Sequence, residues 1–527
     1  MLNKYRKSFI NNWKENLYLF SLAAFLVALP TSISLISCAA VALLVVWIIT
    51  GDYKTKWNRL KKNIGAWLMM SIPLLYLIGL CFTHNFTIGI QELNKSLYWF
   101  IFAFVLGSSS EISYRNSRRL LGVYIAAVSW VALFALLKLL FAAHINYFDF
   151  RQVTLIDHIP FSYQIAFALW LTLYFIYYEK LNKATKALLF LLVLFLLVTF
   201  FSLKSFNAYI YFAGMTLPAL LILIWTAKKR FLKFTFIGIF IFITTFPIVY
   251  VYQCVKKFYT ITEYHYDTIE KHTSNGNLYY HDFNNKMKEN GNYVSLFICE
   301  EELVPLWNAN STIEYHSETS GGFSFHSIIK RYMTSRGLTK DADGFAQLSL
   351  ADIKNIENGY PNYIYAENKL SVYPRIYETI WEIDLYKIYR DPNGKTFAQR
   401  IEQALLACSI IKSNIWFGIG LGNSTLAYEK AIKETGSKLQ PQVLNSSHNQ
   451  YLNYLYRFGV LGTFYILGIL IWVFLKGRKS NSFLVTIFFV SMLAANLGEA
   501  NWETFVGINF FAFFFCFLLW IMPSAEK

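Results

Sequence analysis

The chain has 527 residues, of which 55% are apolar and 15% are charged, and its formal net charge is +16. Soluble domains carry roughly 25% charged residues. The apolar residues here come in blocks of about 17–25, long enough to cross a bilayer core as helices. This pattern excludes an ordinary soluble protein. Because most of the positive charge falls in short segments between the apolar blocks, membrane topology explains it, and no nucleic-acid partner is expected.

The apolar blocks predict about twelve transmembrane helices. In chain order they are expected at 15–30, 33–50, 64–82, 93–108, 120–142, 161–178, 186–203, 206–226, 232–252, 449–475, 482–498 and 504–522. The first block lacks a small-residue cleavage pattern, so we expect it to be retained rather than removed as a signal peptide. The predicted fold class is therefore an all-α polytopic membrane protein.

Lysine and arginine alternate in density between successive short loops. One set of loops is rich in them, whereas the alternate set holds Lys95, Arg151 and Lys204. Positively charged loops stay on the cytoplasmic side of a membrane, so we expect both termini inside and the poor set outside. The chain then divides into transmembrane helices 1–9 at 1–252, a large outer loop domain at 253–448, and helices 10–12 at 449–527.

The outer segment 253–448 is polar and about one domain long. Turn sequences such as Glu289-Asn290-Gly291 separate short stretches that carry Tyr, Ile and Val. These features predict an α+β loop domain with a partly β subdomain at about 260–390. Cys254 and Cys299 lie in a compartment that permits disulfides, but the sequence does not decide whether they pair.

An amphipathic helix is predicted from Thr396, because apolar residues recur there every three to four positions, at Phe397, Ile401, Leu405 and Cys408. Arg400 lies near its start and could hold a phosphate with its planar guanidinium, or be a solvated or salt-bridged arginine. The following Gly418-x-Gly420-x-Gly422 does not have the spacing of a dinucleotide fingerprint and predicts a tight turn after the helix.

The most informative stretch, Ser446-Ser447-His448-Asn449, opens the tenth predicted transmembrane helix. We expect Ser446 or Ser447 to cap this helix and His448 to lie in its first turn. The positive helix end would keep the imidazole neutral. A neutral imidazole can accept a proton from an attacking hydroxyl. The alternative is an interfacial histidine that makes one hydrogen bond.

Three further ionisable residues lie on the predicted outer side. Glu499 and Glu503 occupy the last outer hairpin, where carboxylates close to hydrocarbon are costly and often functional, although both could be solvated loop acids. Lys204, in a very short outer turn, is a second basic candidate or a plain interfacial lysine. No H-E-x-x-H motif or Asp-rich cluster occurs in the sequence, so no metal or other cofactor is expected.

Two of these segments together resemble the signature of the O-antigen ligase / O-antigen polymerase superfamily. They are Arg400 with Gly418-x-Gly420-x-Gly422-Asn423, and Ser447-His448-Asn449-x-Tyr451-Leu452 with Gly459-x-x-Gly462. The resemblance extends to the architecture of about twelve spans with a large loop between helices 9 and 10.

The resemblance implies an enzyme that moves a glycan from undecaprenyl diphosphate to an acceptor hydroxyl. The transfer would be metal-independent and inverting, at the periplasmic face of a bacterial inner membrane. His448 would be the catalytic residue that activates the acceptor, and Arg400 would bind the diphosphate, with Lys204 in place of a second family arginine. Accessory roles are expected for Asn449, Tyr451, Glu499 and Glu503.

Within this family the resemblance favours a ligase that uses a lipid A-core acceptor. A polysaccharide polymerase or a protein O-oligosaccharyltransferase would share its donor and catalytic groups and differ in the acceptor. A transporter is a different class, in which charges and broken helices gather near the bilayer midplane, often in repeated halves. The candidates here gather at the outer surface instead. The expected partners are the carrier-linked donor, the acceptor and membrane lipids.

Overall fold

The computed structural model describes residues 13–141, 153–318, 324–367, 371–441, 446–477 and 482–523. By compactness the chain divides into two units, which we call the helical unit (Met1–Phe240 with Gln399–Lys527) and the loop unit (Ile241–Ala398). Arg151, one of the predicted outer cations, lies outside the described residues.

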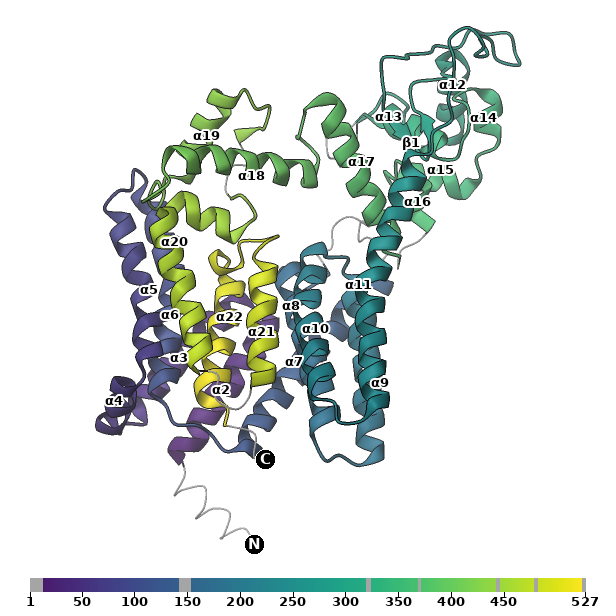
Figure 1. Ribbon diagram of the computed structural model, residues 1–527. Coiled ribbons are helices and arrows are strands. Elements are labelled where there is room, and N and C mark those ends of the chain that lie inside the picture. The colour runs from purple at the N-terminus through teal and green to yellow at the C-terminus, as the bar shows by residue number, and fades with distance from the viewer. Residues whose placement is uncertain are drawn as a thin grey trace. The chain divides into compact units, whose positions relative to one another are not determined.

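Each of the twelve predicted transmembrane segments is helical in the structure (Figure 1). The corresponding helices are α2 (Trp13–Thr31), α3 (Ile33–Ile49), α5 (Ile64–Leu80), α6 (Phe86–Ser108), α7 (Tyr114–Phe141), α8 (His158–Tyr178), α9 (Lys183–Ser202), α10 (Phe206–Thr226), α11 (Arg230–Tyr259), α20 (Gln450–Gly477), α21 (Ser482–Ala495) and α22 (Phe505–Cys516), which continues as a π-helical turn at Phe517–Ile521. The all-α, multi-pass character that the sequence predicts is therefore confirmed.

By length and composition, fewer than twelve of the described helices qualify as candidate membrane spans. Six of them, α7 to α11 and α20, are long and apolar enough to cross a membrane. The short basic helix α4 (Tyr53–Lys62) was not predicted from the sequence. Together with α3 it passes the same test, but the axes of the two helices are bent by 114° relative to each other. α5, α21 and α22 are apolar but shorter. Twelve crossings thus stay a prediction.

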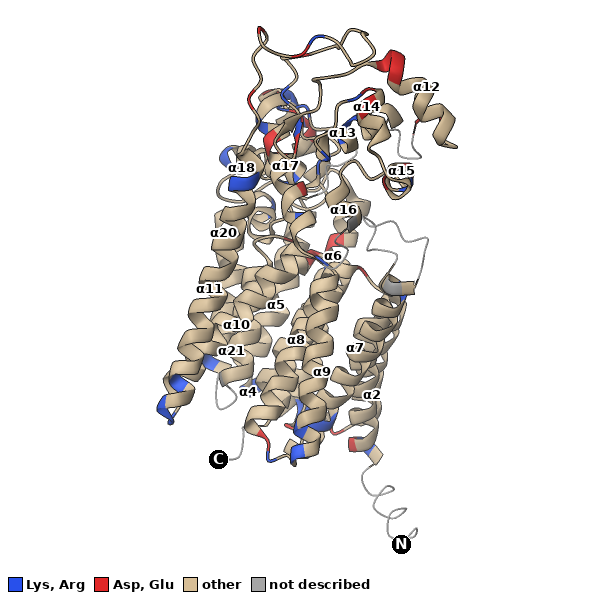
Figure 2. Cartoon of the chain, turned by 90° about the vertical axis from the view of Figure 1, so that its right-hand side faces the viewer, with Lys and Arg blue, Asp and Glu red and all other residues tan. Residues whose placement is uncertain are grey.

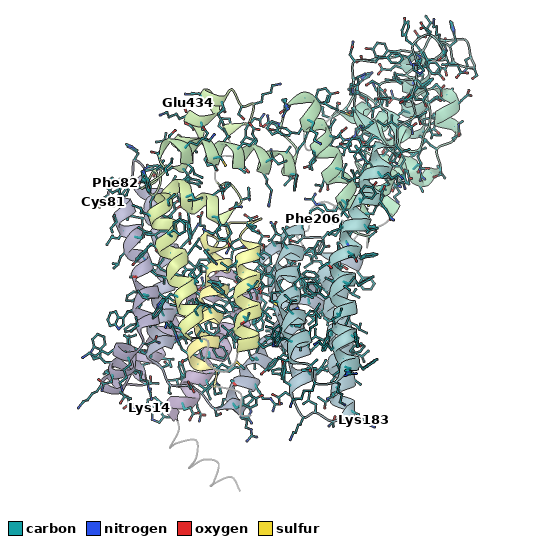
Figure 3. The ribbon with its side chains drawn as sticks, viewed as in Figure 1. Lys14, Cys81, Phe82, Lys183, Phe206 and Glu434 are labelled. Carbon is teal, nitrogen blue, oxygen red and sulfur yellow. The ribbon has the colours of Figure 1, made fainter. Side chains whose placement is uncertain are left out.

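Charge is distributed along the helical unit as a membrane protein requires. Figure 2 shows Lys and Arg gathered at the lower ends of α9 and α11, with the lengths of the helices almost free of charge. In Figure 3, Lys14 and Lys183 lie at one end of the helical unit, and Phe82 and Phe206 lie at the other. Which end faces the cytoplasm stays a prediction.

The core of the helical unit is built around α22. Phe510, Phe511, Phe513 and Phe514 of this helix are almost fully buried, and their rings contact aromatic side chains of α2, α6, α8 and α21. This packing fixes α22 and, with it, the hairpin at 496–504 that precedes it and carries Glu499 and Glu503.

The loop unit is mainly helical. Its helices are α12 (Glu300–Asn310), α13 (Phe325–Ser335), α14 (Ala342–Ala346), α15 (Leu350–Glu357), α16 (Tyr363–Glu367) and α17 (Tyr373–Tyr389), and its one described sheet is an antiparallel pair, β1 (Lys288–Glu289) with β2 (Asn292–Tyr293). Cys254 and Cys299 are buried and both are free thiols.

The prediction of a partly β subdomain is thus wrong in the amount of strand, because the described part of the region has one short strand pair, and its other regular elements are helices. A turn that the sequence predicts there is nevertheless present. Gly291 has the positive φ value that such a turn favours. The apolar stretches form helices because they have helical spacing and caps: Ile329, Tyr332 and Met333 are buried on one face of α13, and Ser349 forms a capping box at the start of α15.

The amphipathic helix predicted from Thr396 is confirmed as α18 (Thr396–Ser413). Its buried side is nevertheless formed by Leu406, Ala407 and Ile410, whereas Phe397, Leu405 and Cys408 are exposed. The reason is that α19 (Ser424–Thr435) and the start of α20 pack on the other side, where they complete a small core with Tyr428 and Tyr456.

Candidate functional site

His448 lies two residues before α20, in a bend of the chain rather than in the first helical turn that the sequence predicts. Its φ is +52°, in the left-handed region that few side chains adopt. Ser446 Oγ accepts the His448 N–H at 3.1 Å. The side chain is 34% exposed, so it is accessible while its backbone is held.

The residue that caps α20 is Asn449, not Ser446 or Ser447. Its side-chain oxygen accepts from the N–H groups of Tyr451 and Leu452, at 3.0 and 3.1 Å. Its amide also donates to the Leu497 carbonyl, and the Tyr451 hydroxyl donates to the Leu493 carbonyl at 2.7 Å. Asn449 and Tyr451 therefore join α20 to α21 and the hairpin that carries Glu499.

Glu499 joins the two principal predicted residues. Its Oε1 lies 2.9 Å from His448 Nδ1, and its Oε2 lies 3.0 Å from an Arg400 guanidinium nitrogen. Arg400 also donates to the Gly498 carbonyl at 2.8 Å, and Asn207 of α10 donates to Glu499 at 3.4 Å. Residues from α10, α18, the turn before α20 and the outer hairpin thus converge on one carboxylate.

The electrostatics of this cluster define which imidazole nitrogen is available. Burial tends to raise the pKa of Glu499, but the hydrogen bond from His448 and the charge of Arg400 act in the opposite direction, and the pKa is lowered on balance. Glu499 is therefore ionised at neutral pH and accepts the hydrogen from Nδ1. The neutral tautomer then has its lone pair on Nε2, which no residue in the described ranges hydrogen-bonds, and this nitrogen can take a proton.

The glycine-rich segment is a structural turn, as predicted. Ile419 and Gly420 donate to the carbonyls of Tyr456 and Arg457, and Val460 donates to the Ile415 carbonyl. These bonds satisfy backbone groups that a break in α20 at Gly459 (φ +63°) leaves free. A Cβ on Gly459 would lie 2.2 Å from the Trp416 backbone, so the two chains approach closely because this residue is glycine.

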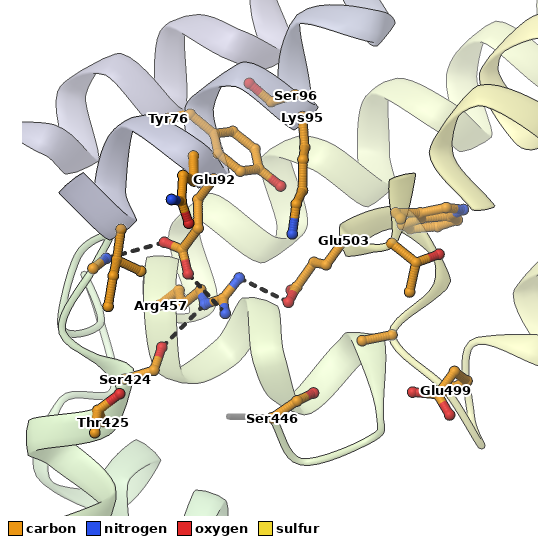
Figure 4. A pocket seen from close by; sticks show the side chains of 16 residues that line it. Tyr76, Glu92, Lys95, Ser96, Ser424, Thr425, Ser446, Arg457, Glu499 and Glu503 are labelled. Atoms are coloured by element: carbon orange, nitrogen blue, oxygen red, sulfur yellow. Dashed lines mark hydrogen bonds and ion pairs between the residues drawn. The ribbon is translucent and has the colours of Figure 1, made fainter. Parts of the chain in front are cut away.

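Beside the break, Arg457 bridges two carboxylates. It lies 3.0 Å from Glu92 of α6 and 2.8 Å from Glu503, and its side chain is 5% exposed (Figure 4). Asn453 and Gln450 of α20 also donate to Glu503. Burial raises the pKa of Glu503, while the charge of Arg457 opposes that shift.

Arg457 and Glu92 were not among the predicted site residues. A charged residue inside an apolar helix is costly and is by default a functional or structural centre, and Arg457 at position eight of α20 was therefore the available signal. Glu92 gave a weaker signal, since the predicted span began one residue after it. Neither sequence position indicates that the two pair.

A cavity of about 420 Å³ connects the two clusters. Its wall includes Glu499 and Ser446 on the side of His448, and Glu92, Arg457 and Glu503 on the other side. This volume is within the range of small-ligand sites. The cavity thus reaches the His448–Glu499–Arg400 cluster at Glu499, and it is large enough to hold a substrate group.

Lys204 lies in the turn between α9 and α10. Its φ is +48° and its side chain is buried, with the residue 5% exposed. Asn207, three positions later, donates a hydrogen bond to Glu499. The turn therefore borders the site, and a phosphate-binding role for Lys204 stays a prediction.

Glu499→Gln tests the orienting role of the carboxylate. We expect kcat for the reaction proposed below to fall about 10- to 100-fold, the usual effect of removing a partner that orients a histidine. In a His448→Ala background the same change should cause no further loss, because the two residues act as one unit. Glu434→Gln, at an exposed acid of α19 (Figure 3), is the control. Additive losses would contradict this role.

Arg457→Leu tests the buried network. It leaves Glu92 and Glu503 without their counter-ion, which should lower the free energy of unfolding by about 3–5 kcal/mol. Thermal unfolding of the purified protein in detergent measures the change. Neutralising the two carboxylates in addition (Glu92→Gln and Glu503→Gln) should recover part of the loss, and a triple variant less stable than Arg457→Leu would contradict the charge argument.

The fold and the site together define a polytopic membrane protein with a histidine–carboxylate–arginine cluster beside a polar cavity. The O-antigen ligase family model matches residues 363–467, a segment that contains Arg400, the glycine-rich turn, His448 and Arg457. This match confirms, over that segment, the predicted resemblance to the O-antigen ligase superfamily. None of the curated proteins compared with the chain matches it.

Proposed function

We propose that this protein is an O-antigen ligase-like glycosyltransferase. It moves a glycan from undecaprenyl diphosphate to a hydroxyl of lipid A-core at the periplasmic face of a bacterial inner membrane. The observation that supports this most directly is the Glu499 carboxylate, which lies 2.9 Å from His448 Nδ1 and 3.0 Å from an Arg400 nitrogen. His448 and Arg400 lie inside the segment that matches the family model, and Glu499 follows it in the chain. The proposed proton acceptor and phosphate-binding cation are thereby held on one carboxylate, which itself lines the cavity.

The proposed reaction is a single displacement. The acceptor hydroxyl oxygen attacks the anomeric carbon, its proton passes to His448 Nε2, and the bond between that carbon and the diphosphate oxygen breaks. The bonding electrons leave with undecaprenyl diphosphate. One displacement inverts the anomeric configuration.

Arg400 supports the departure of the diphosphate. A guanidinium has five N–H donors, and Arg400 uses two of its nitrogens in the bonds to Gly498 and Glu499. The remaining donors can bind phosphate oxygens as negative charge develops there. No step uses a metal ion, so transfer by the purified protein should persist in EDTA.

A gel profile of surface glycolipids from a strain that lacks the gene tests the proposal. The ligase predicts bare lipid A-core together with glycan that accumulates on the undecaprenyl carrier, restored by the wild-type gene and not by His448→Ala. Core that carries single repeat units would identify a polymerase instead. An unchanged profile would contradict both and direct attention to glycoproteins.

A further inference from the structure

Lys95 projects into the cavity from α6. It shares a helix face with Glu92, which also lines the cavity, and Figure 4 shows its side chain running past the Tyr76 ring toward Glu503. The residue is half-buried. Within the described part of the chain, no side chain or carbonyl lies within hydrogen-bond or ion-pair distance of its ammonium group. A lysine in such a position loses hydration without gaining a direct partner.

The other charged groups of the cavity are committed to one another. Arg457 binds Glu92 and Glu503, and Glu499 binds Arg400 and His448. Among the described residues that line the cavity, Lys95 is thus the cation available to a ligand. Its ammonium can act as a point charge toward a phosphate, which binds lysine well without needing the planar geometry of arginine.

We propose that Lys95 binds a phosphoryl group of the substrate in this cavity. The proposal rests on the proposed function, because a carrier-linked donor has a diphosphate and a core acceptor can be phosphorylated. The shared chemistry is a phosphoryl group, and its source is either the donor or the acceptor. A purely structural lysine, which offsets the charge of Glu503 across the cavity, would leave ligand affinity unchanged.

Binding of inorganic pyrophosphate to the purified full-length protein in phosphate-free detergent buffer tests the proposal. Lys95→Ala should weaken binding about ten- to hundredfold, the range for a hydrogen bond to a charged group. Lys95→Arg should retain most of the affinity because it keeps the charge. Lys430→Ala, which removes an exposed lysine of α19, is the matched control. Expression, elution volume and thermal midpoint confirm that each variant is folded.

Transfer kinetics then identify the source. A raised KM for the carrier-linked donor in Lys95→Ala assigns the phosphoryl group to the donor, and a raised KM for the acceptor assigns it to the acceptor. Equal pyrophosphate binding by wild-type protein and Lys95→Ala, or none by either, would overturn the proposal even if transfer occurs. If the wild-type protein transfers no glycan yet binds pyrophosphate through Lys95, the proposed function fails and the phosphoryl site stands.

Discussion

His448→Ala is expected to lower the rate of glycan transfer by about 10²–10⁴-fold, the usual contribution of a general base. The imidazole is the group beside the cavity whose free nitrogen can accept the acceptor proton, and Glu499 fixes the tautomer that makes this nitrogen available. KM for the donor should change little, because the side chain acts on the acceptor. Single-turnover transfer by the purified protein measures the loss.

The matched control for this prediction is His84→Ala, because His84 is exposed in the same unit and binds Asn423 through its backbone N–H rather than its ring. It should transfer glycan at the wild-type rate. If His448→Ala accumulates normally in the membrane and still transfers glycan at the wild-type rate, His448 is not the base. The histidine would then be an interfacial residue that serves only its hydrogen bond to Glu499.

Arg400→Ala is expected to lower transfer by about 10²–10³-fold, comparable to the loss of one group that stabilises developing negative charge. Arg400→Lys should recover part of this activity, since it restores the charge but not the two-pronged geometry. Arg59→Ala, at an exposed arginine of α4, should have no effect. Rates of transfer with each variant at matched membrane abundance provide the measurement.

Arg400 has two available roles, which a double-variant comparison separates. If it only holds Glu499 in place, Arg400→Ala combined with Glu499→Gln should be no slower than Glu499→Gln alone. If it binds the diphosphate, the double variant should lose further activity and show a higher KM for the donor. We expect the second result, because the guanidinium keeps donors beyond those that contact Gly498 and Glu499.

The glycine-rich and H-N-x-Y segments contain both a residue with a proposed catalytic role and residues whose role is to hold the structure together. His448 faces the site, but Asn449 caps α20 and Asn423 binds the Phe82 and Ile419 carbonyls. Gly418 and Gly459 allow two backbones to meet at the break in α20. Much of the motif therefore serves to place Arg457 in the wall of the cavity and His448 against Glu499, which also lines it.

The sequence by itself determined the all-α, multi-pass architecture, because hydropathy and helical spacing are local properties that each segment carries independently. It also identified His448 and Arg400 as candidates, because the segments that carry them resemble a family signature, and Glu499, because a carboxylate beside apolar helices is costly. It did not predict the mainly helical loop unit, because the caps that select helix there depend on single side chains such as Ser349.

Only the tertiary structure decided which of these residues meet. Glu92, Arg457 and Glu503 come from three segments far apart in the chain, and so do Arg400, His448 and Glu499. Their pairing depends on how α6, α18, α20 and the outer hairpin pack, and no local pattern encodes that packing. For the same reason only the structure separates Lys95, which has no counter-ion among the described residues, from the charged groups that are already paired.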